Sequence, residues 1–205
     1  MNSFRIEEIS MINLSKKQYY FLVFLLFIAV LYGYKKHQEV SNQQNYLNPL
    51  LMERVHSIQD EIHTASSILT TAMDENQIPY AQWMQLKSAY KTIEDASYEI
   101  EKMARAIYPN RAQGLENATK TTSYLMASAL VYIEDNFIEA NLDRLDMITF
   151  SADEREVLEP IYNTTLAWRK ISSQYYVVTS IITRKYWVDM MKEIQEESIL
   201  FQKDK

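Results

Sequence analysis

The sequence predicts an all-α protein in which a single N-terminal transmembrane helix is followed by an antiparallel, up-down-up-down four-helix bundle. The first observation behind this prediction is that 205 residues include only two glycines and four prolines, which leaves little material for hairpins or barrel corners. The second is an uncharged apolar run near the N-terminus. The third is the spacing of apolar residues by threes and fours in the rest of the chain, as in amphipathic helices.

The expected membrane segment is Tyr19–Tyr34, which follows an N-terminal tail of residues 1–18. The segment carries no charge and would span roughly 24 Å as a helix, less than the hydrocarbon core of about 30 Å. Lysine pairs at 16–17 and 35–36 can make up the difference, because their long side chains reach the headgroups. Tyrosines at both ends suit the two interfaces, so the lipid bilayer is the first expected partner.

Two other interpretations of this segment stay open. A cleaved signal peptide fits the basic-then-apolar order, although Leu31 and Gly33 make a poor cleavage site. A buried core helix, or the inserting segment of a pore-former, fits the composition as well. For a single-pass anchor, Arg5, Lys16, Lys17 and the terminal amine favour a cytoplasmic N-terminus and an extracytoplasmic bundle, in the periplasm or at the cell exterior.

Residues 35–48 are polar and are interpreted as a tether or a weak helical continuation, and the bundle is expected over residues 49–205. Asn48 is a candidate N-cap of a new helix, with Pro49 as its first residue. The apolar stripe of this helix consists of Leu51, Val55, Ile58, Ile62, Ala65, Leu69 and Ala72. After a turn that ends at Pro79, the stripe of the next helix consists of Leu86, Ala89, Ile93, Ala96, Ile100, Met103 and Ile107.

The third stripe consists of Met126, Leu130, Ile133 and Phe137 and continues toward Leu145. Ser151 and Glu154 form a capping box that opens a fourth helix, and Pro160 predicts a kink or a separate first turn. The fourth stripe consists of Ile161, Trp168, Ile171, Tyr175, Val178, Ile182 and Tyr186. A single helix of about 50 residues would outrun its neighbours, so its C-terminal part is expected to protrude. Deletion of residues 190–205 is then expected to leave the bundle folded.

Composition predicts a protein without catalytic activity or a cofactor. The absence of cysteine excludes disulfides, thiolate zinc sites and thiol nucleophiles. Three histidines and two glycines provide neither a nucleophile elbow nor a phosphate-binding loop. The net charge of −6, without a cluster of Lys and Arg beyond the membrane-flanking lysine pairs, argues against nucleic acid as a partner.

One group of residues has metal-ligand spacing. His56, Asp60 and His63 lie at i, i+4 and i+7 and form a weak surface candidate. Glu53 and His56, like Asp60 and His63, each match half of a carboxylate-bridged di-metal pattern, but both pairs lie on the same helix and beside its apolar stripe. We therefore expect a solvated helix flank and no buried metal centre.

Aromatic residues give a candidate ligand pocket. Counting helical turns from each loop places Tyr90, Tyr132 and Trp168 at similar heights, near small hydroxyl side chains, and Tyr175 lies on the same face of its helix as Trp168. Such residues could line a small-molecule site between helices. They could equally be core aromatics whose polar tips reach the surface.

The leading functional hypothesis is a non-catalytic interaction or scaffold module that docks protein partners of a membrane or envelope complex. The expected docking surface consists of Met190, Met191, Ile194, Ile199, Leu200 and Phe201, and a homo-oligomer is left open. A second hypothesis is a sensor that binds a small ligand and signals through a partner. The layout is similar in architecture alone to the extracytoplasmic four-helix bundles of chemoreceptors and sensor kinases. A third hypothesis is a helical pore-forming or membrane-tethering protein.

Overall fold

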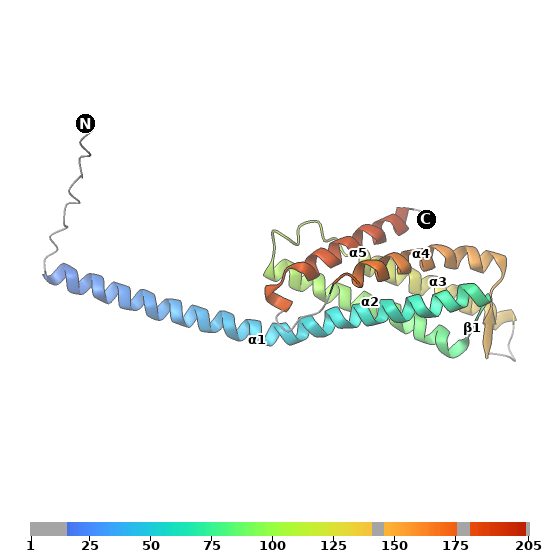
Figure 1. Cartoon of the computed structure of the whole chain (residues 1–205), viewed down its shortest axis with the longest axis horizontal. Coiled ribbons are helices and arrows are strands. Elements are labelled where there is room, and N and C mark those ends of the chain that lie inside the picture. The colour runs from blue at the N-terminus through green and yellow to red at the C-terminus, as the bar shows by residue number, and fades with distance from the viewer. Residues whose placement is uncertain (1–15, 141–145, 176–180, 204–205) are drawn as a thin grey trace, which may run out of the picture. The chain divides into compact units, whose positions relative to one another are not determined.

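The computed structural model describes residues 16–140, 146–175 and 181–203 (Figure 1). Two compact units divide the chain, residues 1–45 and residues 46–205, and we call the second unit the helical body. The described residues form five α-helices, one short 3-10 helix and two strands of three residues each. The predicted all-α class is therefore confirmed.

Helix α1 (Lys16–Glu75) begins in the first unit and ends in the helical body. The predicted start of a new helix at Asn48 and Pro49 is wrong, because Pro49 lies inside α1. Asn48 does not cap a helix through its side chain here. Its Oδ1 accepts a hydrogen bond from the backbone N of Ile182 at 3.0 Å. Pro49 offers no N–H to the carbonyl of Asn45, so the boundary between the units coincides with a missing helical hydrogen bond.

The predicted core stripes of the first three bundle helices are confirmed. All seven stripe residues of α1 are at most 1% exposed, from Leu51 to Ala72. In α2 (Tyr80–Ile107) the stripe is buried from Leu86 to Ile100, and in α3 (Ala118–Ala140) Met126, Leu130 and Ile133 are fully buried. Met103, Ile107 and Phe137 pack against this core while partly exposed, and Leu145 lies outside the described residues.

Two short strands were not predicted from the sequence. β1 (Gln77–Pro79) pairs antiparallel with β2 (Met147–Thr149). Ile78 and Ile148 lie opposite each other in this pair, and both are buried. Asn76 precedes β1 at a positive φ of 54°, which asparagine tolerates, and its Nδ2 donates to the carbonyl of Phe150 at 3.0 Å. Three residues are too few to show the alternation that marks a strand.

The predicted fourth helix is wrong in its length. α4 (Ala152–Ser172) opens with the predicted capping box at Ser151 and Glu154 and continues across Pro160. It ends at Ser172, and the 3-10 helix η1 (Ile181–Thr183) precedes a separate helix, α5 (Tyr186–Lys203). Val178 lies outside the described residues. α5 reverses direction and packs beside α4 and α3 (Figure 1).

The reversal of α5 corrects the expected protruding tail. Met190, Met191 and Ile194 are fully buried and Phe201 is 3% exposed, whereas Leu200 alone of the six predicted docking residues is exposed, at 53%. Ile199 is half-buried. A helix that lies against two others can bury its apolar stripe within its own chain, which a protruding helix cannot. The expectation that this stripe is open to a partner is therefore wrong.

Candidate functional site

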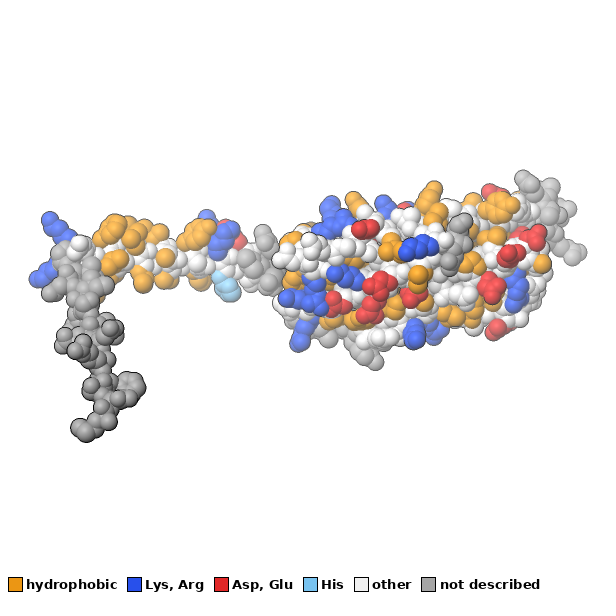
Figure 2. Space-filling model, turned by 90° about the horizontal axis from the view of Figure 1, so that it is seen from above, with side chains coloured by type: hydrophobic (Ala, Val, Ile, Leu, Met, Phe, Trp, Pro, Cys, Tyr) orange, Lys and Arg blue, Asp and Glu red, His pale blue; other side chains and the backbone are white. Residues whose placement is uncertain are grey.

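The N-terminal unit carries an exposed apolar helix segment. Within Lys16–Glu39, an 18-residue window has a mean hydropathy of 1.4, and none of that window is buried. Every large hydrophobic side chain of Tyr19–Tyr34 is at least 45% exposed. Figure 2 shows these apolar side chains along the helix, with lysines at both ends. This part of the chain is long and apolar enough to cross a membrane.

The four predicted pocket residues lie in different surroundings. Tyr90 and Trp168 are fully buried in the core, and Tyr132 is 62% exposed on α3. Tyr175 follows the C-terminal end of α4, and its hydroxyl donates to Glu193 of α5 at 2.6 Å. Burial, with a smaller contribution from this hydrogen bond, raises the pKa of Tyr175 to about 12. The structure thus separates Tyr132 from Tyr90 and Trp168, and places Tyr175 at a cleft described below.

Tyr90 is anchored in the core by its polar tip. Its hydroxyl lies 2.6 Å from Oγ1 of Thr165, and Thr165 uses its own proton on the carbonyl of Ile161 at 2.7 Å. Tyr90 is therefore the donor to Thr165. Burial raises the pKa of Tyr90, so the phenol stays protonated. These contacts are those of a structural aromatic residue with a satisfied hydroxyl.

A polar cleft lies between the middle of α1 and the C-terminal end of α4. Its volume is about 460 Å³, within the range of small-molecule sites. The lining residues are Gln59, Asp60, His63, Arg169, Ser172, Ser173 and Tyr175. Gln59 connects the two walls, because its Nε2 donates to the carbonyls of Ser172 (3.0 Å) and Tyr175 (2.7 Å) at the end of α4. The Ser172 carbonyl also accepts from the backbone N of Tyr175 at 3.1 Å, so Gln59 binds a turn that follows the end of α4.

Two of the three candidate metal ligands line this cleft. Asp60 and His63 line it, whereas His56 does not. Arg169 Nη2 lies 3.4 Å from His63 Nε2, and a guanidinium so close to the ring nitrogen repels a cation. Within the described ranges, no three His, Asp or Glu side chains are placed to hold a metal ion.

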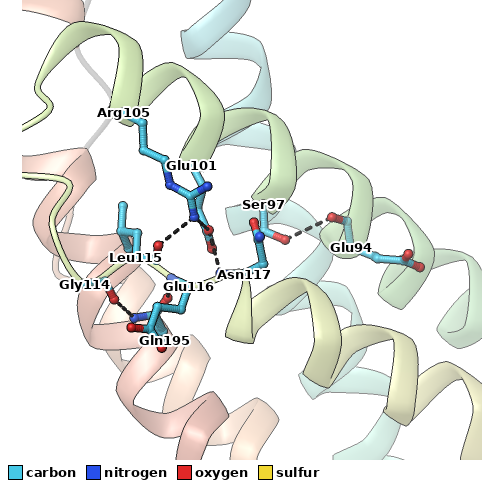
Figure 3. Close-up of polar contacts among 9 residues, drawn as sticks. All are labelled: Glu94, Ser97, Glu101, Arg105, Gly114, Leu115, Glu116, Asn117 and Gln195. Carbon is cyan, nitrogen blue, oxygen red and sulfur yellow. Dashed lines mark hydrogen bonds and ion pairs between the residues drawn. The ribbon is translucent and has the colours of Figure 1, made fainter.

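A second polar cluster is buried where the α2–α3 connection meets α5 (Figure 3). Glu101 of α2 is fully buried, and its Oε2 accepts from the backbone N of Asn117 at 2.9 Å and from Arg105 Nη2 at 3.4 Å. Its Oε1 has no hydrogen-bond partner among the described residues. Burial raises the pKa of Glu101, and the hydrogen bond from Asn117 and the charge of Arg105 oppose this rise.

Gln195 of α5 completes this cluster. Its Oε1 accepts from the backbone N of Glu116 at 2.7 Å, and its Nε2 donates to the carbonyl of Gly114 at 2.5 Å. Gly114 has a φ of +86°, a conformation that glycine adopts without strain. Arg105 also donates to the carbonyl of Leu115 at 2.6 Å. Because most of these bonds end on backbone groups, the cluster fixes the α2–α3 connection to the helices on either side.

Comparison of the chain with protein-family models, with curated proteins and with solved structures gave no match.

Sequence reasoning singled out Asp60, His63 and Tyr175 but missed Gln59, Arg169 and the two serines as parts of one cleft. Arg169 lies 106 residues after His63, and nothing in the sequence marks that pair. A weak signal exists within each helix: Asp60 and His63 are three apart, as are Arg169 and Ser172, so each pair shares a helix face. Their alignment across the two helices depends on tertiary packing.

Proposed function

We propose that this protein is a non-catalytic, single-pass membrane protein whose antiparallel helical bundle is an interaction module of a membrane or envelope complex. The observation that carries the proposal is the exposed apolar segment Tyr19–Tyr34 in a chain whose helical body has its own buried core. Exposed apolar surface of this extent is costly in water and is favourable in a bilayer.

The anchor is tested by replacing Leu25 and Leu26 with arginine. Each arginine at the centre of a membrane helix costs about 2.5–3.5 kcal/mol on insertion scales, so the double variant should be recovered in the soluble fraction. Leu200→Arg is the matched control, because Leu200 is 53% exposed on α5 and its replacement should leave membrane retention unchanged. Retention of the double variant after carbonate extraction would refute the anchor.

With α5 packed inside, other surfaces support the interaction role. The exposed large apolar residues of α2 and α3 include Tyr98 (44%), Tyr124 (57%), Val131 (41%) and Tyr132 (62%). Lys120 of α3 lies 4.5 Å from the ring centroid of Tyr98, a cation–π contact that ties the two exposed helix faces together. Tyrosine is enriched at protein interfaces because its ring is apolar and its hydroxyl polar.

A photo-crosslinking residue placed at Tyr124 or Tyr132 in intact cells tests this role. We expect discrete crosslinked products from these positions and none from Lys170, which is exposed on α4. Crosslinking confined to lipid, or equal labelling at all three positions, would contradict the interaction module.

For orientation we propose a cytoplasmic N-terminus, so added protease should digest the helical body from the extracytoplasmic side.

A second candidate function, ligand sensing through a partner protein, is favoured by one observation. The α1–α4 cleft has the volume of a small-molecule site, and its walls carry charged side chains from two helices. Ligand binding there would change the contacts between α1 and α4.

A further inference from the structure

The α1–α4 cleft contains a cationic and an anionic side chain that do not neutralise each other. Arg169 and Asp60 both line it, yet no ion pair within 4.0 Å joins them. No other carboxylate of the described residues is paired with Arg169, and no cation of these residues with Asp60. Two opposite charges in one cleft are therefore available to a ligand.

Arg169 is the half-buried member of the pair. Its guanidinium has five N–H donors, and its side-chain contact within the described residues is the ring nitrogen of His63 at 3.4 Å. A histidine nitrogen provides no negative charge to balance a guanidinium. The planar fork of donors matches a carboxylate, which it binds through two parallel hydrogen bonds.

Acceptors stand on the opposite wall of the cleft. Asp60 is exposed on α1, one residue from Gln59. Gln59 uses its Nε2 on the end of α4, which leaves its Oε1 as a further acceptor. Tyr175 also lines the cleft, and its ring is held in place by the hydrogen bond to Glu193 and by stacking on Tyr186 at a centroid distance of 6.2 Å.

We propose that this cleft binds a free α-amino acid, with the carboxylate on Arg169 and the ammonium group on Asp60. An anion without a cationic group is disfavoured by the carboxylate of Asp60, and a cation without an anionic group by the guanidinium of Arg169. A molecule that carries both an anionic and a cationic group can bind Arg169 and Asp60 at the same time. The inference deepens the second candidate function and does not depend on the membrane anchor.

The test is isothermal titration calorimetry of the full-length protein in detergent micelles. The probes are the standard L-amino acids, with acetate and methylammonium as the two separate halves of the ligand. We expect at least one amino acid to bind at least about tenfold more tightly than either half, since each charge-assisted hydrogen bond contributes on that scale. Failure of every amino acid to bind at concentrations up to about 10 mM would overturn the proposal.

Variants locate the binding. Arg169→Gln and Asp60→Asn should each weaken it by about tenfold or more. Lys170→Gln and Asp74→Asn, which remove exposed charges of the same sign from the same helices, should change it less than about twofold. Equal affinity for acetate, or equal effects of the control variants, would overturn the assignment. Binding without any change in a partner's activity would refute the sensor and leave the amino-acid site standing.

Discussion

The buried position of α5 makes a prediction opposite to that from the sequence alone. Removal of residues 190–205 deletes four apolar side chains that are at most 3% exposed, namely Met190, Met191, Ile194 and Phe201. It also removes Gln195, whose amide binds the backbone of Gly114 and Glu116. We expect the truncated protein to lose its cooperative fold.

The magnitude follows from the buried area. A fully buried large apolar side chain contributes about 1.5–3 kcal/mol, so four of them contribute about 6–12 kcal/mol. Typical domains unfold with a free energy of about 5–15 kcal/mol, which the loss would match or exceed. A smaller perturbation leaves a measurable folded state: Ile194→Ala should cost about 2–5 kcal/mol through lost burial and a residual cavity.

The assay is thermal unfolding of the full-length protein in detergent, followed by near-ultraviolet circular dichroism of the buried tryptophans. For a chain of this size, 1 kcal/mol shifts Tm by about 2–4 °C, so Ile194→Ala should lower it by between about 4 and 20 °C. Leu200→Ala is the matched control on the same helix. Because Leu200 is 53% exposed, its replacement should shift Tm by no more than about 2 °C.

Two results would refute this reasoning. One is a protein lacking residues 190–205 that still shows a cooperative transition at an unchanged Tm. The other is an equal shift for Ile194→Ala and Leu200→Ala, which would mean that α5 does not bury one face against α3 and α4.

Three further predictions concern single side chains. Because the pKa of Glu101 is raised in the folded state, its stabilising contribution is complete below the ordinary value of 4.5 and is lost as the pH rises through the raised pKa. The Tm gain of Glu101→Gln over the unsubstituted protein, measured by thermal unfolding, should therefore grow as the pH rises above 4.5, and a gain that does not change with pH would contradict the raised pKa. Tyr90→Phe removes the hydrogen bond to Thr165 and should lower stability by about 1 kcal/mol in the same assay, and an unchanged Tm would contradict the role given to this hydroxyl. Ser151→Ala breaks the capping box of α4 and should cost about 1 kcal/mol, and Ser151→Asp, which preserves an N-cap acceptor, should recover most of it.

The parts of the fold that the sequence predicts are those encoded by local periodicity. The stripe from Leu51 to Ala72 and the stripe from Leu86 to Ile100 needed nothing beyond the spacing of apolar residues by threes and fours. The capping box at Ser151 is likewise local, since both of its hydrogen bonds lie within four residues. The pairing of Ile78 with Ile148 is not local, because it joins three-residue segments 70 positions apart that carry no pattern of their own.

The candidate cleft was recoverable only in part, for a similar reason. Asp60 and His63 attracted attention because carboxylate and imidazole groups occur together at helical spacing, and they suggested a metal. The structure brings Arg169 within 3.4 Å of the ring nitrogen of His63, which disfavours a cation there and supports our proposal that an anionic group binds. The residue across the cleft, Arg169, determines which kind of ligand Asp60 and His63 can help to bind. The spacing of Asp60 and His63 along α1 does not reveal that residue.

The failure at the C-terminus gives a physical rule for chains of this kind. A single helix from residue 152 to 203 would outrun α1 and α2, and an unsupported helix end is marginal in water. The segment Tyr186–Lys203 nevertheless carries an apolar stripe as strong as those of the core helices, and leaving Trp187, Met191 and Ile194 in solvent would forfeit several kcal/mol. A reversal after Ser172 costs a few helical hydrogen bonds, and Gln59 offsets part of this cost by donating to the carbonyls of Ser172 and Tyr175. The free energy gained by burying these side chains exceeds that cost. An apolar stripe that extends past its neighbouring helices is therefore better read as a turn back into the core than as a docking surface.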